Sequence, residues 1–267
     1  MVLEVSVERE DTSDDRDLKR NSRRYELFTV YVEEQRILSI YAESDFQMKK
    51  WISDVQKSFL KKKNHPLVIG MFVDRDRDHR WGRQRSEDPY AHLILCIGHH
   101  CLVYCLPDYS YKNYHRNDPD SVPEIEPAPR VLQDFMADPN VIVVGLNMNE
   151  ICEKLEKDHQ LKIARSVDVW KLAYKVLGFR TVTKLSKTDD PIVAYTRSLV
   201  DKSMDVVKPK KIDMWTDPED SNKRPYQGHT YDINRDYIKF RTVDAYFAHL
   251  IGVQYLDTIN EIYPRKK

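Results

Sequence analysis

The chain lacks net charge, long apolar runs and a signal sequence, and each absence excludes a class of protein. Its 43 basic residues cancel its 43 acidic residues, so no overall field draws it to nucleic acid or membrane, and such binding must come from local patches. No apolar run approaches the roughly 20 residues of a membrane-spanning helix. The N-terminus, which contains Glu and Asp, lacks the basic and apolar regions of a signal peptide. We expect a nuclear or cytoplasmic protein with no membrane partner.

Cysteine is also scarce. Four cysteines in 267 residues do not make a disulfide framework, and we expect them to be reduced. The group Cys96, His99, His100 and Cys101 superficially suggests zinc, but these residues belong to a tight strand-turn-strand unit whose side chains would diverge. The sequence shows no glycine-rich phosphate loop and no local signal of a Ser-His-Asp or Cys-His nucleophile.

What is present suits a globular protein. With 41% hydrophobic and 10% aromatic residues, the chain can bury a sizeable core. Residues 1–23 are charged and poor in apolar side chains after Val7, so we expect a mostly disordered leader. A single domain is expected over residues 24–264.

Periodicity and turn residues predict the elements of that domain. Predicted strands cover residues 25–32, 36–42, 67–73, 91–97, 101–106 and 141–146, with a short one near 166–167. Predicted helices cover 45–59, 130–137, 149–159, a segment ending at Gly178, 191–204 and 233–262. Antiparallel strands followed by alternating helix and strand predict an α/β fold: a ribonuclease-H-like mixed sheet flanked by helices on both faces.

Three segments resemble the motifs of one enzyme family: residues 67–74, 141–156 and 240–244. From about Tyr25 to Ile259 the sequence resembles the Werner-syndrome-type 3′–5′ exonucleases of plants, which belong to the DEDD superfamily together with ribonuclease D. Shorter matches support the alignment at Val144-Gly145, residues 153–156, residues 166–168, Leu172-Ala173 and residues 243–245. The resemblance implies the DEDD exonuclease fold over nearly the whole chain.

In that family four carboxylates hold two divalent metals, and a Tyr positions the attacking water. The resemblance places Phe72 at the first Asp, Asp74 at the Glu, Ile151 at the second-segment Asp and Phe240 at the Tyr, and it keeps only Asp244. It therefore implies that Asp74 and Asp244 are remnants of the catalytic set. A paired metal site needs several carboxylates, and a ring or an alkyl chain offers no ligand atom.

Two interpretations of metal binding remain open at this stage. With Asp74 and Asp244 alone, the protein would bind no metal, or one Mg²⁺ or Mn²⁺ weakly together with phosphate and water. In a shifted site, Asp74 and Asp76 would share a strand face, and Glu150 would join them and Asp244 as ligands. Against the shifted site, the pair moves roughly 6–7 Å along the strand, and Glu150 lies about 100° from Ile151 around its helix.

The segment after the third predicted strand is rich in arginine. Arginines beside a Trp can hold phosphates and stack a base, and the candidate nucleic-acid-binding residues are Arg75, Arg77, Arg80, Trp81 and Arg83. Interspersed acidic residues favour the alternative of a solvated mixed-charge loop that includes Asp74, Asp76 and Asp78. Lys208 is likewise interpreted as a flexible loop charge.

Three functions follow from these interpretations. The favoured one is a nucleic-acid-binding 3′–5′ exonuclease-like domain that no longer hydrolyses its ligand. The alternatives are an active metal-dependent exonuclease that uses the shifted site, and a module whose cleft binds a protein partner through the three apolar replacements. In all three cases Phe72, Asp74, Ile151, Phe240 and Asp244 are expected to converge on one side of the central sheet.

Overall fold

The computed structural model describes residues 4–10, 25–59, 66–75, 89–107, 109–110, 124–200, 206–209, 212, 214 and 233–262. Its strands are β1 (Val5–Arg9), β2 (Tyr25–Val32), β3 (Gln35–Ala42), β4 (Leu67–Asp74), β5 (His92–Ile97), β6 (His100–Cys105), β7 (Tyr109–Ser110), β8 (Glu124–Ile125), β9 (Val141–Gly145) and β10 (Ser166–Asp168). Its helices are α2 (Asp45–Phe59), α3 (Arg130–Met136), α4 (Met148–His159), α5 (Val169–Leu177), α6 (Phe179–Leu185), α7 (Pro191–Leu199) and α8 (Arg235–Ile262).

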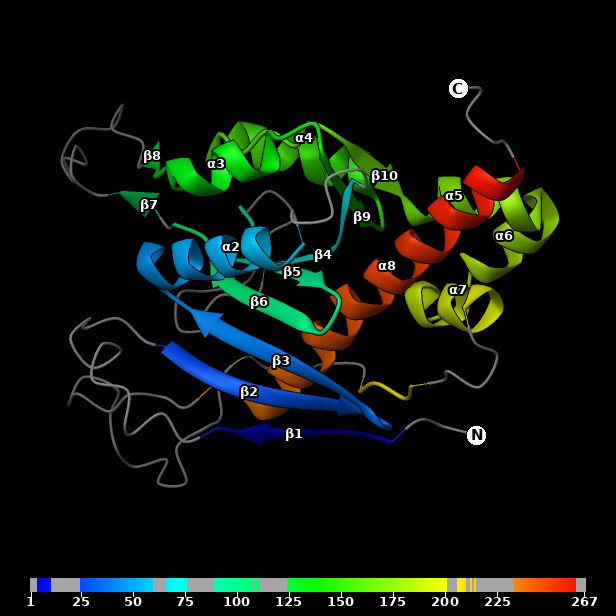
Figure 1. The fold of residues 1–267 in the computed structure, drawn as a ribbon, viewed down its shortest axis with the longest axis horizontal. Helices are drawn as coiled ribbons and strands as arrows, with labels where there is room; N and C mark the ends of the chain where they lie inside the picture. Colours follow the sequence, from blue (N-terminus) through cyan, green and yellow to red (C-terminus); the bar gives the residue numbers. More distant parts are fainter. Residues whose placement is uncertain are drawn as a thin grey trace, which may run out of the picture.

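Eight strands form one mixed sheet in the order β1-β2-β3-β6-β5-β4-β9-β10 (Figure 1). Strands β4, β5 and β6 make the predicted antiparallel meander, and β9 and β10 extend the sheet in parallel with β4. The β2–β3 hairpin joins the other side through a parallel pairing of β3 with β6. The β4 and β9 strands therefore end at the same edge of the sheet.

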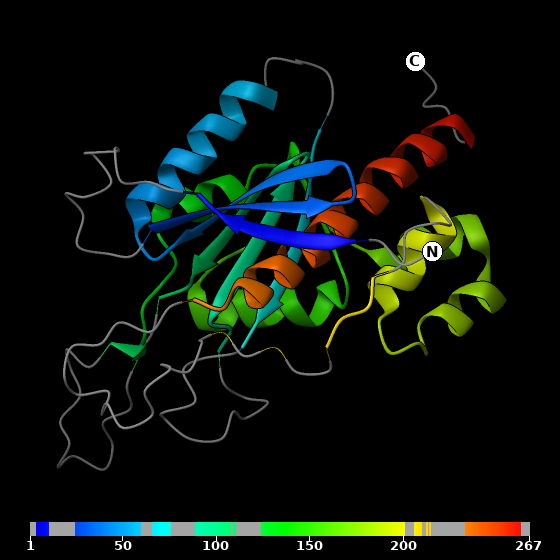
Figure 2. The same cartoon turned by 90° about the horizontal axis from the view of Figure 1, so that it is seen from below.

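Alternate strand residues face two hydrophobic cores, one on each side of the sheet, because successive side chains of a strand point to opposite faces. Leu93 and Leu95 pack with residues of α2, α3 and α4. Ile94 and Cys96 pack with residues of α5, α7 and α8. The predicted ribonuclease-H-like mixed sheet with helices on both faces is confirmed, and Figure 2 shows the same layers from below.

Helix α8 crosses β4 closely because Gly70 has no side chain. A Cβ atom there would lie 2.0 Å from the Ala245 carbonyl oxygen and 2.3 Å from the His249 nitrogen. His249 accepts the Gly98 N–H at Nε2 (2.9 Å), and its Nδ1 lies 3.2 Å from the Val68 carbonyl oxygen. Since Nε2 accepts, Nδ1 carries the proton and donates to Val68. Burial lowers the pKa of His249 to about 4, so this contact is made by a neutral ring.

Several element predictions need correction. The helix predicted over 191–204 ends at Leu199, and the two-residue strands β7 and β8 were not predicted. Val5–Arg9, inside the expected disordered leader, form edge strand β1, which pairs antiparallel with β2. Only two residues of this strand, Val5 and Val7, show the alternation of apolar and polar side chains that predicts a strand. Two residues among charged neighbours are too few to predict one. Helix α6 was not predicted, because Val182 is its only fully buried residue. Residues 1–3 and 11–23 of the leader lie outside the described residues. Among the helices described, none is both long and apolar enough to cross a bilayer.

Candidate functional site

A pocket of about 520 Å³ lies at the edge of the sheet where β4 and β9 end. Open α/β sheets commonly bind ligands beyond the carboxyl ends of their strands. Phe72, Asp74, Ile151 and Asp244 all line this pocket, so the structure brings together four of the five predicted motif positions. Phe240 lies one helical turn before Asp244 on α8 and is buried, with the ammonium of Lys239 4.6 Å from the centre of its ring.

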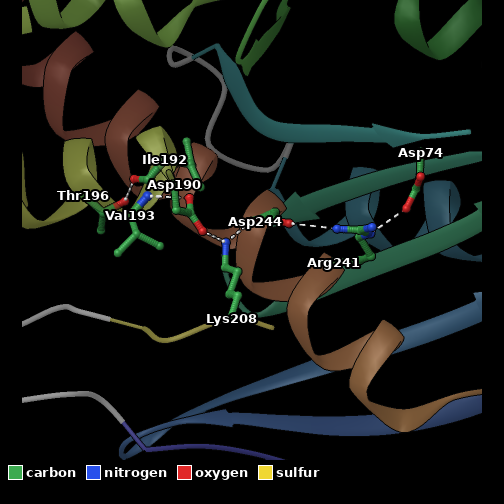
Figure 3. Close-up of polar contacts among 8 residues, drawn as sticks. All are labelled: Asp74, Asp190, Ile192, Val193, Thr196, Lys208, Arg241 and Asp244. Carbon is green, nitrogen blue, oxygen red and sulfur yellow. Dashed lines mark hydrogen bonds and ion pairs between the residues drawn. The ribbon is translucent and has the colours of Figure 1, made fainter. Parts of the chain in front are cut away.

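The two remaining motif carboxylates share one guanidinium (Figure 3). Arg241 donates from Nε to Oδ2 of Asp74 at 2.6 Å, and its Nη1 lies 3.6 Å from Oδ2 of Asp244. The three side chains are 18%, 13% and 6% exposed for Arg241, Asp74 and Asp244. Asp74 is therefore part of a partly buried ion pair at the end of β4, and its interpretation as a member of a solvated loop is wrong.

Lys208 completes the charge compensation on the other side of Asp244. Its ammonium donates to Oδ1 of Asp244 and lies 2.7 Å from Oδ2 of Asp190, and its side chain is 12% exposed. Asp190 caps α7, where its Oδ1 accepts the Val193 N–H at 3.2 Å. The interpretation of Lys208 as a flexible loop charge is wrong. Its sequence neighbourhood is polar, and only the fold brings it to two carboxylates more than 15 positions away on either side.

Burial and attraction act against each other in this network. Burial by itself lowers the pKa of Lys208, but Asp244 and Asp190 outweigh it and hold the net pKa above the ordinary value. Arg241 behaves in the same way, with Asp74 and Asp244 as its partners. Burial raises the pKa of Asp244, and the two cations partly oppose this shift. Both cations therefore remain charged at neutral pH.

Aromatic rings enclose the guanidinium of Arg241. Its carbon lies 5.0 Å from the centre of the Phe72 ring and 5.3 Å from that of Tyr237. A guanidinium within about 6 Å of a ring centre is attracted by the quadrupole of the ring. Phe72 therefore has a structural role that an aspartate would not fill, because it helps to hold the cation that links Asp74 to Asp244.

Glu150 also lines the pocket. Its side chain is 73% exposed and lies 3.7 Å from Arg75, whose guanidinium is 5.0 Å from the Tyr90 ring centre. Arg75 thus lies beside the ring of Tyr90 at the pocket, and its role in a nucleic-acid contact stays a prediction. The other residues predicted for that contact, Arg77, Arg80, Trp81 and Arg83, lie outside the described residues, as does Asp76 of the shifted metal site.

The side chains of the site do not fit a pair of divalent metals. Among the residues that the structure describes, no three His, Cys, Asp or Glu side chains gather closely enough to hold a metal ion. Asp74 and Asp244 already have cationic partners, and Phe72 and Ile151 offer the pocket no ligand atom. A metal would have to displace Arg241 before it could contact both carboxylates.

Sequence reasoning missed Arg241 and Asp190, and each had a detectable signal. Arg241 precedes Asp244 by three positions on a predicted helix, a spacing that places two side chains on one face. Asp190 directly precedes Pro191, and an Asp before a Pro at the first helical position is typical of a helix start. The contact of Lys208 with both acids had no local signal.

Comparison with known proteins gives matches only among solved structures. No family model matches the chain, and no curated protein matches it. A crystal structure of the EXD2 exonuclease domain soaked in Mn is 14% identical with a TM-score of 0.36, covering 84% of this chain and 93% of that one. Escherichia coli RNase D, an exoribonuclease involved in structured RNA processing, is 11% identical with a TM-score of 0.48, covering 83% and 45%. The catalytic core of RRP6 from Trypanosoma brucei is 8% identical with a TM-score of 0.45, covering 84% and 48%. The chain thus spans about half the length of the last two.

Proposed function

We propose that this protein is a nucleic-acid-binding relative of the plant Werner-syndrome-type exonucleases that does not hydrolyse phosphodiester bonds. The observation that carries this proposal is the chain of ion pairs Asp74–Arg241–Asp244–Lys208. In a two-metal nuclease, metals neutralise the carboxylates, activate water and stabilise the leaving oxygen. Here two side chains supply the neutralising charge, and neither can activate water. We place this function in the nucleus or cytoplasm.

The charge at the pocket supports binding without cleavage. Arg241 and Lys208 offset the two motif carboxylates Asp74 and Asp244, and Arg75 offsets Glu150, the third carboxylate that lines the pocket, so the lining no longer presents a strongly negative wall to a phosphate. Arg75 lines the same pocket and offers a charged fork suited to a phosphate group. Apolar walls at Phe72, Ile151 and other lining residues suit the face of a base.

Two assays test this proposal together. The protein, with Mg²⁺ or with Mn²⁺, is incubated with single-stranded and duplex oligonucleotides labelled at the 5′ end, and binding is followed by anisotropy. The expected result is binding of a single-stranded oligonucleotide without shortening above a no-enzyme control. Shortening that Asp244→Ala abolishes would refute the proposal and favour an active site built on Asp74, Asp76, Glu150 and Asp244. The absence of oligonucleotide binding would refute it as well.

A protein-binding cleft is the second candidate, and the apolar part of the pocket wall favours it. Met71, Phe72, Val73, Leu146 and Ile151 all line the pocket beside the charged network. Such a wall can take an apolar side chain of a peptide. Ile151→Asp would abolish peptide capture by this wall. Arg75→Ala would weaken oligonucleotide binding and leave peptide capture by the apolar wall within a few-fold of the unmodified protein, and this variant separates the two candidates.

A further inference from the structure

We propose that helices α5 and α6 form a second contact surface, which binds the single strand of a nucleic acid by stacking its bases. The surface is defined by three exposed aromatic side chains, Trp170, Tyr174 and Phe179, with the basic side chains around them. The inference rests on the proposed function for the class of ligand, but the surface lies outside the pocket and its residues take no part in the ion-pair network.

The aromatic side chains are more exposed than a packing role explains. Trp170 is 39% exposed, Tyr174 46% and Phe179 61%, although large apolar side chains are normally covered. The rings of Trp170 and Tyr174 stack, with centres 5.7 Å apart and planes inclined by 18°, and the Phe179 ring meets Tyr174 edge-on at 6.3 Å. The three rings form one continuous aromatic surface instead of scattered single exposures.

The segment that carries these rings, between Asp168 and Asp189, has charge of one sign. Residues 169–188 contain five basic residues and no acidic one, whereas the whole chain has equal numbers of both. All five are exposed: Lys171, Lys175, Arg180, Lys184 and Lys187. The carboxylate of the neighbouring Asp168 accepts hydrogen bonds from the backbone N–H groups of Met148 and Trp170. Such a surface can bind single-stranded nucleic acid, because the bases can stack on the aromatic rings while lysine and arginine side chains contact the phosphates.

The surface begins beside the pocket. Asn147 lines the pocket, and Asn149, two residues further on, accepts a hydrogen bond from Lys171 at 3.3 Å. Trp170 directly precedes Lys171 at the start of α5. Figures 1 and 2 both show α5 and α6 grouped with α7 beside the C-terminal part of α8. A single-stranded nucleic acid whose end lies in the pocket can therefore continue past α4 onto the aromatic surface.

A protein partner is the competing occupant of an exposed aromatic surface. The single-sign charge decides against it here, because a mixed-charge protein surface would leave several of the five cations without a partner, whereas every nucleotide brings one anionic phosphate. Self-association through this surface would also place the five cations of one copy near those of another, which disfavours a symmetric dimer.

The test measures binding of a fluorescent oligothymidylate of roughly 12 nucleotides by anisotropy at several salt concentrations. Trp170→Ala/Tyr174→Ala is expected to bind at least about 10-fold more weakly, and Trp170→Phe is expected to retain binding because a phenyl ring still stacks. Lys175→Ala/Arg180→Ala is expected to reduce the slope of log affinity against log salt by about 1.4, the value for two lost phosphate contacts. The matched control is Phe46→Ala, which removes a 50% exposed ring from α2 on the other side of the sheet and is expected to change nothing.

Each outcome separates this inference from the function on which it rests. If the unmodified protein does not bind the oligonucleotide, the proposed function fails and the inference fails with it. If it binds and the double aromatic variant binds equally well, only the inference is overturned. A change in sedimentation of that variant without a change in oligonucleotide affinity would assign the surface to protein association and overturn it too. Because Lys175 and Arg180 are exposed, the salt-slope variant keeps the test decisive if the aromatic variant misfolds.

Discussion

Helix α8 meets strand β4 twice, once through charges and once through neutral groups. At Asp74 the contact is a guanidinium shared between two carboxylates. At Gly70 it is a direct backbone approach, fixed by a neutral His249 that uses both ring nitrogens. The neutral contact fixes how closely the helix approaches the strand, whereas the charged contact joins two pocket-lining carboxylates through one cation. The two contacts therefore separate what positions α8 on β4 from what sets the charge of the pocket.

Reverting the three apolar replacements should have the largest effect on the charged contact. Phe72→Asp/Ile151→Asp/Phe240→Tyr removes the ring beside Arg241 and adds two partly buried carboxylates to a pocket already lined by Asp74, Glu150 and Asp244. We expect this crowding of like charges to cost several kcal/mol unless a divalent metal compensates them. We expect the melting temperature to fall without metal and to rise again with Mn²⁺. An equally stable, metal-insensitive triple variant would show that these positions are not coupled to the charge network.

Removing the shared cation should be the next largest effect. Arg241→Ala leaves Asp74 and Asp244 without their common partner, while Lys208 still contacts Asp244. Breaking a buried pair costs about 3–5 kcal/mol, and we expect the lower end of this range because Arg241 and Asp74 are only partly buried. Mn²⁺ should restore part of this loss, because a ligand that binds only the folded state stabilises it. Urea unfolding with and without Mn²⁺ measures both effects. The matched control is Arg130→Ala, whose pair with Asp134 is exposed and worth no more than about 1 kcal/mol.

The neutral contact can be tested at its glycine. Gly70→Ala places a methyl group against the backbone of Ala245 and His249, which cannot move without shifting α8, so we expect a loss of about 3 kcal/mol in unfolding free energy. Gly252→Ala on the same helix meets only methyl groups of Val144 and Val68 and should cost less. If the two variants lost the same unfolding free energy, α8 would be able to shift over β4 without cost, and the account of this contact would be wrong.

Acidification should weaken the neutral contact by a smaller amount. The pKa of His249 is lowered to about 4 from an ordinary value of 6.5, so its contribution to stability is fully present above pH 6.5 and is lost as the pH falls toward 4. Between pH 6.5 and pH 5 the loss should reach about 2 kcal/mol. The measurement is the unfolding free energy as a function of pH for the unmodified protein and for His249→Gln. Subtracting one curve from the other cancels the contributions of the other titrating groups. Parallel curves would contradict a buried neutral His249.

The fold was predictable from the sequence where an element has many buried side chains. The β4, β5, β6 and β9 strands lie close to their predicted bounds because they are short, mostly buried apolar runs, and helices α2, α4 and α8 do so because apolar residues recur on one face. Strand β1 and helix α6 have too few buried side chains for such a signal.

The site was predictable only in part. The resemblance identified Phe72, Asp74, Ile151 and Asp244 as positions of interest, and the structure places all four at one pocket. It could not show that Lys208 reaches Asp190 and Asp244, because that contact joins segments of α7, α8 and a polar stretch between them. Sequence patterns report burial along one element, whereas an ion pair between elements depends on how the elements cross.

A crystal soaked in manganese tests the central claim, that side-chain cations and not metal neutralise Asp74 and Asp244, most directly. The anomalous difference map reports manganese alone, and the ordinary map shows the position of Arg241. We predict no manganese peak between Asp74 and Asp244, with the Arg241 guanidinium in contact with both carboxylates. A manganese peak at that position, with the side chain of Arg241 displaced, would contradict the account and restore a metal-dependent active centre.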